Sequence, residues 1–159
     1  MRLDEWMMVK PLNLNLGCGN KKLAGYCNID ISPKSKADVV YDLSKSIPFP
    51  QSSVDKILCA HFIEHLEDTI HIMNEIWRVC KDGAIVEIIV PHQSSRMAFA
   101  DPTHKRIFNE ESFGYFCSNG EHYWIHEIYG IKCNFNLESQ KVKKDKRYGD
   151  MRVTLKAIK

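Results

Sequence analysis

Residues 12–20 read LNLNLGCGN and carry the clearest structural signal in the chain. Leu12, Leu14 and Leu16 alternate with two asparagines, which is the period of a β-strand with one buried face. The alternation ends at Gly17, where G-x-G predicts a tight turn. Because glycine has no Cβ, the backbone of such a turn can approach a ligand closely. We therefore expect a strand that leads into a ligand-binding loop.

Short β patterns and turns alternate after this strand, and one amphipathic helix follows them. Residues 69–81 place apolar side chains on one helical face, with Asp68 as the N-cap and Asp82-Gly83 as the stop. An almost continuous apolar run, AIVEIIV, is typical of a buried parallel strand. The expected strands lie at residues 26–31, 37–41, 54–60 and 84–90.

The remaining segments complete a single domain over residues 1–159. We expect a short N-terminal segment at 1–11, a substrate-side loop region at 92–123 with a short helix after Asn109, and a C-terminal β-hairpin within 124–159, its strands at 125–140 and 151–158. Strands joined by crossovers predict an α/β fold: a Rossmann-like, doubly wound, mostly parallel sheet with a C-terminal antiparallel hairpin and a truncated N-terminal part.

Composition narrows the class of protein. The 159 residues are 44% hydrophobic and 26% charged, which is ordinary for a globular domain. The net charge of +2 predicts neither a nucleic acid nor a membrane as partner. The six cysteines form no C-x-x-C pair, so we expect reduced thiols and a cytoplasmic protein.

Two acids follow the next expected strands. Asp30 ends the second strand and Asp42, with Leu43 beside it, ends the third. In open α/β sheets ligands bind at these strand ends, where an acid can accept the hydroxyls of a ribose. The spacing disfavours a nicotinamide dinucleotide, because about ten residues separate Gly19 from Asp30, against roughly twenty in that motif, and Lys22 stands where its third glycine belongs. A nucleoside without phosphates fits better.

The stretch from residue 12 to about 113 resembles the class I S-adenosylmethionine-dependent methyltransferases, in particular the small type 11 kind. The resemblance covers about two thirds of the chain and does not specify the substrate. The matching pieces are LNLGCGN (14–20), NIDIS (28–32), DLSKSIPFPQSSVDKI (42–57), HFIEHL (61–66), EIWRVCKDGAIVEIIVPH (75–92) and DPTHKRIF (101–108).

This resemblance implies S-adenosylmethionine as cofactor and a set of contacts to it. The glycine turn would hold it through its backbone, the two acids with their neighbours would hold the adenosine, and the end of the fourth strand would lie beside the methionyl part. The implied residues are Asn15, Leu16, Gly17, Cys18, Gly19, Asp30, Ile31, Asp42, Leu43, Ala60, His61 and Phe62.

The chain departs from the family pattern in three ways. Asn15 stands where an acid is common, which predicts a weaker contact to the cofactor's ammonium group. The first helix is very short or absent, and about ten residues precede the first strand. The last two departures predict an open cofactor site, whose lid is missing or supplied by a partner subunit, as in a homodimer.

Histidines near the expected strand ends are the candidates for a catalytic base. His61, His92 and His104 are the catalytic candidates, because they follow the fourth and fifth strands. Glu64-His65 is expected to fix the turn into the helix. His61 and His65 lie four apart, but at a strand end rather than within a helix, so no metal ion is expected.

Methyl transfer to an unidentified acceptor, a small molecule or a glycan, is the function we expect. A non-catalytic cofactor-binding or scaffold protein is one alternative, and binding without turnover would identify it. An RNA methyltransferase is the other, resting on a basic run that otherwise reads as a solvated turn. That run comprises Lys141, Lys143, Lys144, Lys146 and Arg147.

Overall fold

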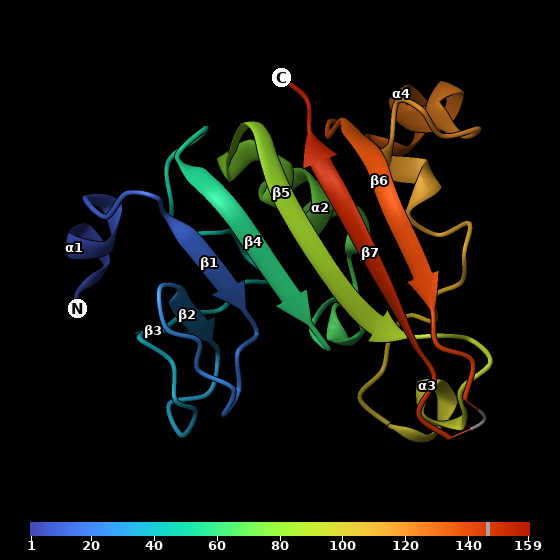
Figure 1. Cartoon of the computed structure of the whole chain (residues 1–159), viewed down its shortest axis with the longest axis horizontal. Coiled ribbons are helices and arrows are strands. Elements are labelled where there is room, and N and C mark those ends of the chain that lie inside the picture. Colours follow the sequence, from blue (N-terminus) through green and yellow to red (C-terminus); the bar gives the residue numbers. More distant parts are fainter. Residues whose placement is uncertain (146) are drawn as a thin grey trace.

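A seven-stranded sheet organises the protein, as the computed structural model shows for residues 1–145 and 147–159 (Figure 1). The strand order is β3-β2-β1-β4-β5-β7-β6. Strand β7 runs antiparallel to both of its neighbours, and the pairs among β1 to β5 are parallel. The strands are β1 (Asn13–Leu16), β2 (Cys27–Asp30), β3 (Val39–Val40), β4 (Val54–Ala60), β5 (Cys80–Pro91), β6 (Phe135–Val142) and β7 (Asp150–Ala157). The Rossmann-like fold with its C-terminal hairpin is thus confirmed.

The helices of the structure are few and short. The α-helices are α1 (Leu3–Met7), α2 (Thr69–Val79), α3 (Arg96–Ala100) and α4 (His126–Tyr129). Three-residue 3₁₀ turns lie at η1 (Ile63–His65), η2 (Gly114–Phe116) and η3 (Tyr123–Ile125). None of the helices in these two described stretches is long and apolar enough to cross a membrane.

Helix α2 covers one face of the sheet. The Asp68 side chain accepts a hydrogen bond of 2.8 Å from the His71 amide and caps the helix, as predicted. The face that includes Met73 and Ile76 is fully buried against the sheet. In Figure 1 this helix lies on the far side, whereas β4, β5 and β7 are unobstructed on the near side.

The predicted end of this helix was wrong. The helix stops at Val79, because Cys80 takes extended dihedral angles and pairs with Val54 in the sheet. Asp82 and Gly83 therefore lie within β5 instead of stopping the helix. A bulge between Val54 and Lys56 absorbs the extra residues of the longer strand.

The C-terminal third also differs from the expectation. The strand expected at 125–140 begins only at Phe135, because the chain before it turns through η3 and α4 and ends at Gly130 in the left-handed conformation. Instead of the helix expected after Asn109, the chain forms turns and the 3₁₀ turn η2. Helix α3 follows Ser95, whose hydroxyl accepts from the Met97 amide, and was not predicted.

A buried asparagine holds the loop that replaces the usual first helix. Residues 17–26 contain no helix, as the sequence predicted. The Asn28 side chain is fully buried; it accepts from the amide of Leu23 and from Asn15 Nδ2, and it donates to the Asp38 carboxylate and to the carbonyls of Leu23 and Tyr26. One side chain thus ties the loop to β1 and β2.

Replacing this asparagine should destabilise the fold. We expect Asn28→Ala to lower the free energy of unfolding by about 3 kcal/mol, since it leaves several buried polar groups without partners. Urea unfolding measures the change. The matched control is Asn13→Ala, whose side chain makes one exposed 3.3 Å bond to Gly25, and for which we expect a change within about 0.5 kcal/mol. Equal losses in the two variants would contradict the assignment.

Candidate functional site

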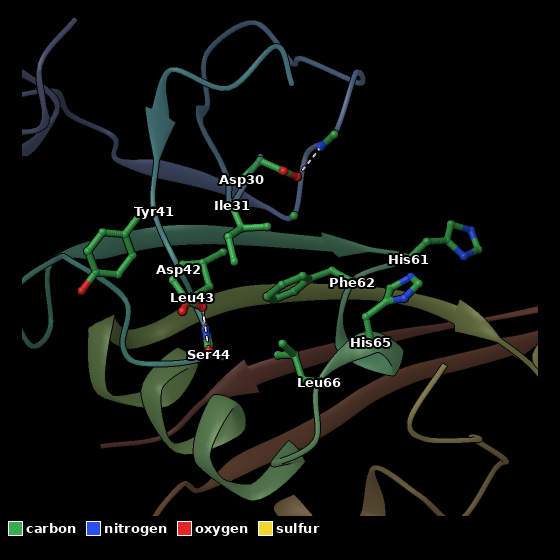
Figure 2. Close-up of a pocket in the computed structure, with 12 residues that line it drawn as sticks. Asp30, Ile31, Tyr41, Asp42, Leu43, Ser44, His61, Phe62, His65 and Leu66 are labelled. Carbon is green, nitrogen blue, oxygen red and sulfur yellow. Dashed lines mark hydrogen bonds between the residues drawn. The ribbon is translucent and has the colours of Figure 1, made fainter. Parts of the chain in front are cut away.

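A cavity of about 550 Å³ opens at the carboxyl ends of β1, β2 and β4 (Figure 2). This volume lies in the range of small-molecule and cofactor sites. Eight of the twelve predicted cofactor residues line it: Gly17, Gly19, Asp30, Ile31, Asp42, Leu43, His61 and Phe62. Tyr41, Ser44, His65 and Leu66 complete the wall.

The glycine turn forms one end of this cavity. Gly17 and Gly19 both have positive φ angles, of 66° and 49°, which favour glycine. A Cβ on Gly17 would lie 2.4 Å from the Phe62 ring, whereas a Cβ on Gly19 would meet no atom within 4 Å. The turn therefore packs tightly against Phe62 at its first glycine and presents open backbone at its second.

Asp30 joins the glycine turn to the end of β2. Its Oδ2 accepts a 2.8 Å hydrogen bond from the Gly19 amide, and its Oδ1 accepts a 2.9 Å bond from the Ser32 amide. Figure 2 shows the carboxylate turned toward the glycine turn. Each oxygen keeps a lone pair, so the carboxylate is held in place and can still accept hydroxyl groups.

Asp42 is the second acid of the wall. Its Oδ1 accepts hydrogen bonds from the Ser44 hydroxyl at 2.6 Å and from the Ser44 amide at 3.1 Å. The bonds from Ser44, and the charge of Lys45 after them, hold the pKa of Asp42 below its usual value. The carboxylate therefore stays ionised as an acceptor beside the apolar side chain of Leu43.

Four predicted cofactor residues do not line the cavity. Leu16 and Cys18 are buried, and Ala60 is half-buried at the end of β4. Asn15 is buried as well, and its amide donates to Asn28 and to the Lys21 carbonyl. Asn15 thus stabilises the loop, and its side chain is not free to bind the cofactor's ammonium group.

His61 begins the far wall with a strained backbone. Its φ of 53° is unusual for a residue with a side chain, and its amide donates to the Ile89 carbonyl at 2.8 Å. The ring lies between two acids, with Nδ1 3.4 Å from Glu64 Oε1 and Nε2 3.7 Å from Asp150 Oδ2. The neighbouring Glu64 carboxylate raises the pKa of His61 above its ordinary value.

A second cavity of about 300 Å³ adjoins the first. His61 and His65 line both cavities, and Figure 2 places the two rings at one end of the first one, opposite Tyr41. The second cavity is lined by His61, Glu64, His65, Pro91, Ser95, Met97, Asp101, His104, Tyr148 and Asp150. It contains no lysine or arginine among its described lining residues.

The three catalytic candidates have different positions. His61 lines both cavities and His104 lines the second. His92 lines neither of them; its side chain is buried, with Nδ1 2.7 Å from the Ser94 hydroxyl and Nε2 3.0 Å from Glu110. The structure brings the first two to the candidate site and leaves His92 in a contact between loops.

The lining residues that were not predicted to contact the cofactor have weak signals in the sequence. Tyr41 and Ser44 merely flank Asp42-Leu43, and their place in the wall follows from the turn after β3. His65 was assigned to a turn, and it does lie in the 3₁₀ turn η1. What the sequence could not show is that this turn separates two cavities.

Of the basic run, Lys141 lies on β6, and Lys143, Lys144 and Arg147 lie between β6 and β7. Lys141, Lys143 and Lys144 are exposed, whereas Lys146 lies outside the described residues. The Arg147 guanidinium stacks 5.0 Å from the centre of its neighbour's ring, Tyr148, at the edge of the second cavity. All six cysteines are buried and free.

Comparison with known proteins gives a family match over less than half of the chain, and the fold. A family model described as "Methyltransferase domain" matches residues 14–88, which hold the glycine turn, both acids and η1. No curated protein matches the sequence. The three solved structures described below are at most 16% identical in sequence to this chain. Likeness at that level shows the fold alone.

Three solved structures illustrate the likeness. A S-adenosylmethionine-dependent methyltransferase from Methanosarcina mazei has a TM-score of 0.64 at 15% identity, covering 99% of this chain and 98% of that one. Another from Archaeoglobus fulgidus has a TM-score of 0.62 at 16% identity, with coverages of 96% and 89%. A complex of the Haloferax volcanii Trm112 methyltransferase activator with a methyltransferase gives 0.62 at 12% identity, with coverages of 98% and 88%.

Proposed function

We propose that the chain is a class I S-adenosylmethionine-dependent methyltransferase and that it methylates a hydroxyl group of a small neutral molecule or glycan. In this proposal the first cavity holds the cofactor and the second holds the acceptor. The observation that carries it is the shared wall, because His61 and His65 line both cavities. Two ligands in these cavities would meet at that wall.

The first cavity fits the cofactor by its chemistry. Asp30 is fixed by two backbone amides and can accept ribose hydroxyls, and Gly19 offers backbone with no side chain in the way. Leu43 and Phe62 offer apolar surface for a base. No lysine or arginine occurs among the described lining residues, which suits a nucleoside without phosphates.

The second cavity favours a neutral, hydroxyl-bearing acceptor. Asp101, Asp150 and Tyr148 supply acceptors and a donor for hydrogen bonds with hydroxyl groups. An anionic acceptor would meet carboxylates there without a lysine or arginine in the described lining. Repulsion between such an anion and these carboxylates in a partly buried site disfavours phosphorylated sugars and RNA backbones as acceptors.

We assign to His61 the role of the base that accepts the proton of the acceptor hydroxyl. When bound, S-adenosylmethionine would supply an electrophilic methyl group on a positively charged sulfur. His61 Nε2 then accepts the hydroxyl proton, with Glu64 beside Nδ1 to orient the ring. This role rests on the position of the ring at the junction of the two cavities.

Removing the imidazole should reduce turnover and leave cofactor binding intact. We expect His61→Gln to lower kcat about 100-fold or more, the usual contribution of a positioned base, with the Kd for S-adenosylmethionine changed less than about threefold. The assay measures transfer of labelled methyl groups to methyl glycosides of hexoses and deoxyhexoses, with calorimetry for cofactor binding. The control is His71→Gln, on α2 and bonded to the Lys45 carbonyl outside both cavities. An unchanged kcat would remove His61 from this role.

Total RNA serves as the competing acceptor in the same assay. The basic run at the end of β6 and in the turn after it is the feature that would bind it, and such binding would weaken steeply with salt. Methyl transfer to RNA but not to any glycoside would overturn the proposed acceptor class. Cofactor binding without transfer to either would favour the non-catalytic alternative.

A further inference from the structure

Three metal-ligating side chains converge at the floor of the second cavity. Glu64 and His65 come from η1, and His104 comes from the loop after α3. One ligand atom from each lies within 4.8 Å of the other two. The backbone holds the two segments together, because the amides of Lys105 and Arg106 donate to the Glu64 carbonyl at 2.7 and 3.2 Å.

The Glu64 carboxylate is buried and poorly compensated. The residue is 1% exposed, and neither oxygen has a hydrogen-bond partner in the described residues. The nearest positive group would be His61 Nδ1, 3.4 Å from Oε1, and only if that ring is protonated. A buried carboxylate without a partner is costly, which indicates that a cation compensates it.

Hydrogen bonds fix both histidine rings in an orientation suited to metal binding. His104 Nδ1 lies 3.1 Å from the Ala98 carbonyl, which can only accept, so Nδ1 carries the hydrogen. His65 Nδ1 lies 2.9 Å from the Thr103 hydroxyl, whose own hydrogen goes to Asp101 at 2.6 Å. Both rings therefore donate through Nδ1 and keep the Nε2 lone pair. This is the arrangement that carbonyls and carboxylates impose on metal-bound histidines.

We propose that Glu64, His65 and His104 bind a divalent first-row transition metal ion such as zinc. Two imidazole nitrogens and one carboxylate oxygen suit such an ion better than calcium or magnesium, which prefer oxygen ligands alone. Bond lengths of about 2.1 Å require the three donors to move closer by rotation of their side chains. The sequence argument against a metal rested on spacing along the chain, and spacing does not show that His104, 39 residues after His65, lies beside it.

The proposed site leaves an open coordination position. All three ligands line the second cavity, so a three-ligand ion there would face that cavity. An acceptor hydroxyl bound to the ion would be easier to ionise. This last role rests on the proposed function, whereas metal binding itself does not.

Metal binding can be tested on the intact chain without cofactor. The protein is stripped with a chelator and titrated with Zn²⁺ by calorimetry, and Co²⁺ is added in parallel to record its visible spectrum. We expect about one ion per chain and the intense absorption of four-coordinate cobalt. Glu64→Gln, which keeps the shape of the side chain, and His104→Asn should each weaken zinc binding at least 100-fold. Thr103→Val, which frees the His65 ring, should weaken it about 10- to 100-fold.

The controls separate this inference from the proposed function. His71→Gln should bind zinc like the unchanged protein, since this histidine lies outside the cluster. Circular dichroism confirms that each variant is folded. Absence of zinc binding, or binding that survives both Glu64→Gln and His104→Asn, overturns the inference. Calorimetry with S-adenosylmethionine on the metal-free protein tests the cofactor site by itself, so either proposal can fail alone.

Discussion

Asp30→Ala is expected to weaken S-adenosylmethionine binding about 100-fold. The carboxylate is held by the amides of Gly19 and Ser32 at 2.8 and 2.9 Å, and it lines the first cavity. A hydrogen bond to a charged group contributes about 1.5–3 kcal/mol, and two such bonds to ribose hydroxyls correspond to at least this factor. Isothermal calorimetry measures the Kd directly.

The matched control is a carboxylate that likewise accepts two hydrogen bonds, one of them from the backbone, but lies away from the cavity. Asp55 accepts from the Leu12 amide at 2.8 Å and from Lys81 Nζ at 2.6 Å, at the opposite end of the sheet. We expect Asp55→Ala to lower stability and to leave the Kd unchanged. If Asp30→Ala bound the cofactor as tightly as Asp55→Ala, the adenosine would have to lie elsewhere.

Much of the fold was predictable from local patterns. The strand at Val54–Ala60 and the start of α2 after Asp68 follow from periodicity and a capping residue, both of which are local properties. The end of α2 was not predictable, because the pairing of Cys80 with Val54 is a contact between segments distant in sequence. The conformation of residues 125–134 was not predictable either. Their composition favours a strand, but the chain forms a short helix that ends at Gly130.

The candidate site, too, was predictable where it follows local patterns and not where it depends on contacts between distant segments. The glycine turn, Asp30 and Asp42 follow strand ends, and parallel strands deliver their carboxyl ends to one edge of a sheet. Their convergence was therefore predictable. The junction at His65 and the approach of His104 depend on a loop that folds back through backbone bonds to Glu64. No spacing rule encodes that approach. Asn15 illustrates the converse, since it lies beside the glycine turn in sequence but its side chain bonds to Asn28 instead of lining the cavity.

Gly17→Ala is expected to damage both stability and cofactor binding. A residue with a Cβ at a φ of 66° carries strain of about 1–2 kcal/mol, and overpacking adds about 1–3 kcal/mol. The overpacking arises because the new methyl group would lie 2.4 Å from Phe62 Cδ2 and 2.7 Å from Phe62 Cβ. Relief requires the turn or Phe62 to move, and both line the first cavity. We expect a loss of about 2–5 kcal/mol in urea unfolding, with S-adenosylmethionine binding weakened about 100-fold, as displacements near 1 Å can cause in an active site.

Gly25→Ala isolates the steric contact from the backbone strain. Gly25 has a φ of 77°, but a Cβ there would meet no atom within 4 Å. It should therefore lose only the strain contribution, about 1–2 kcal/mol, and bind the cofactor normally. The double variant Gly17→Ala with Phe62→Ala should recover part of the stability, because the ring is gone while the close Cβ remains. Equal losses for Gly17→Ala and Gly25→Ala would mean that backbone conformation alone requires glycine at the turn, and that Phe62 does not restrain the loop beside the cofactor.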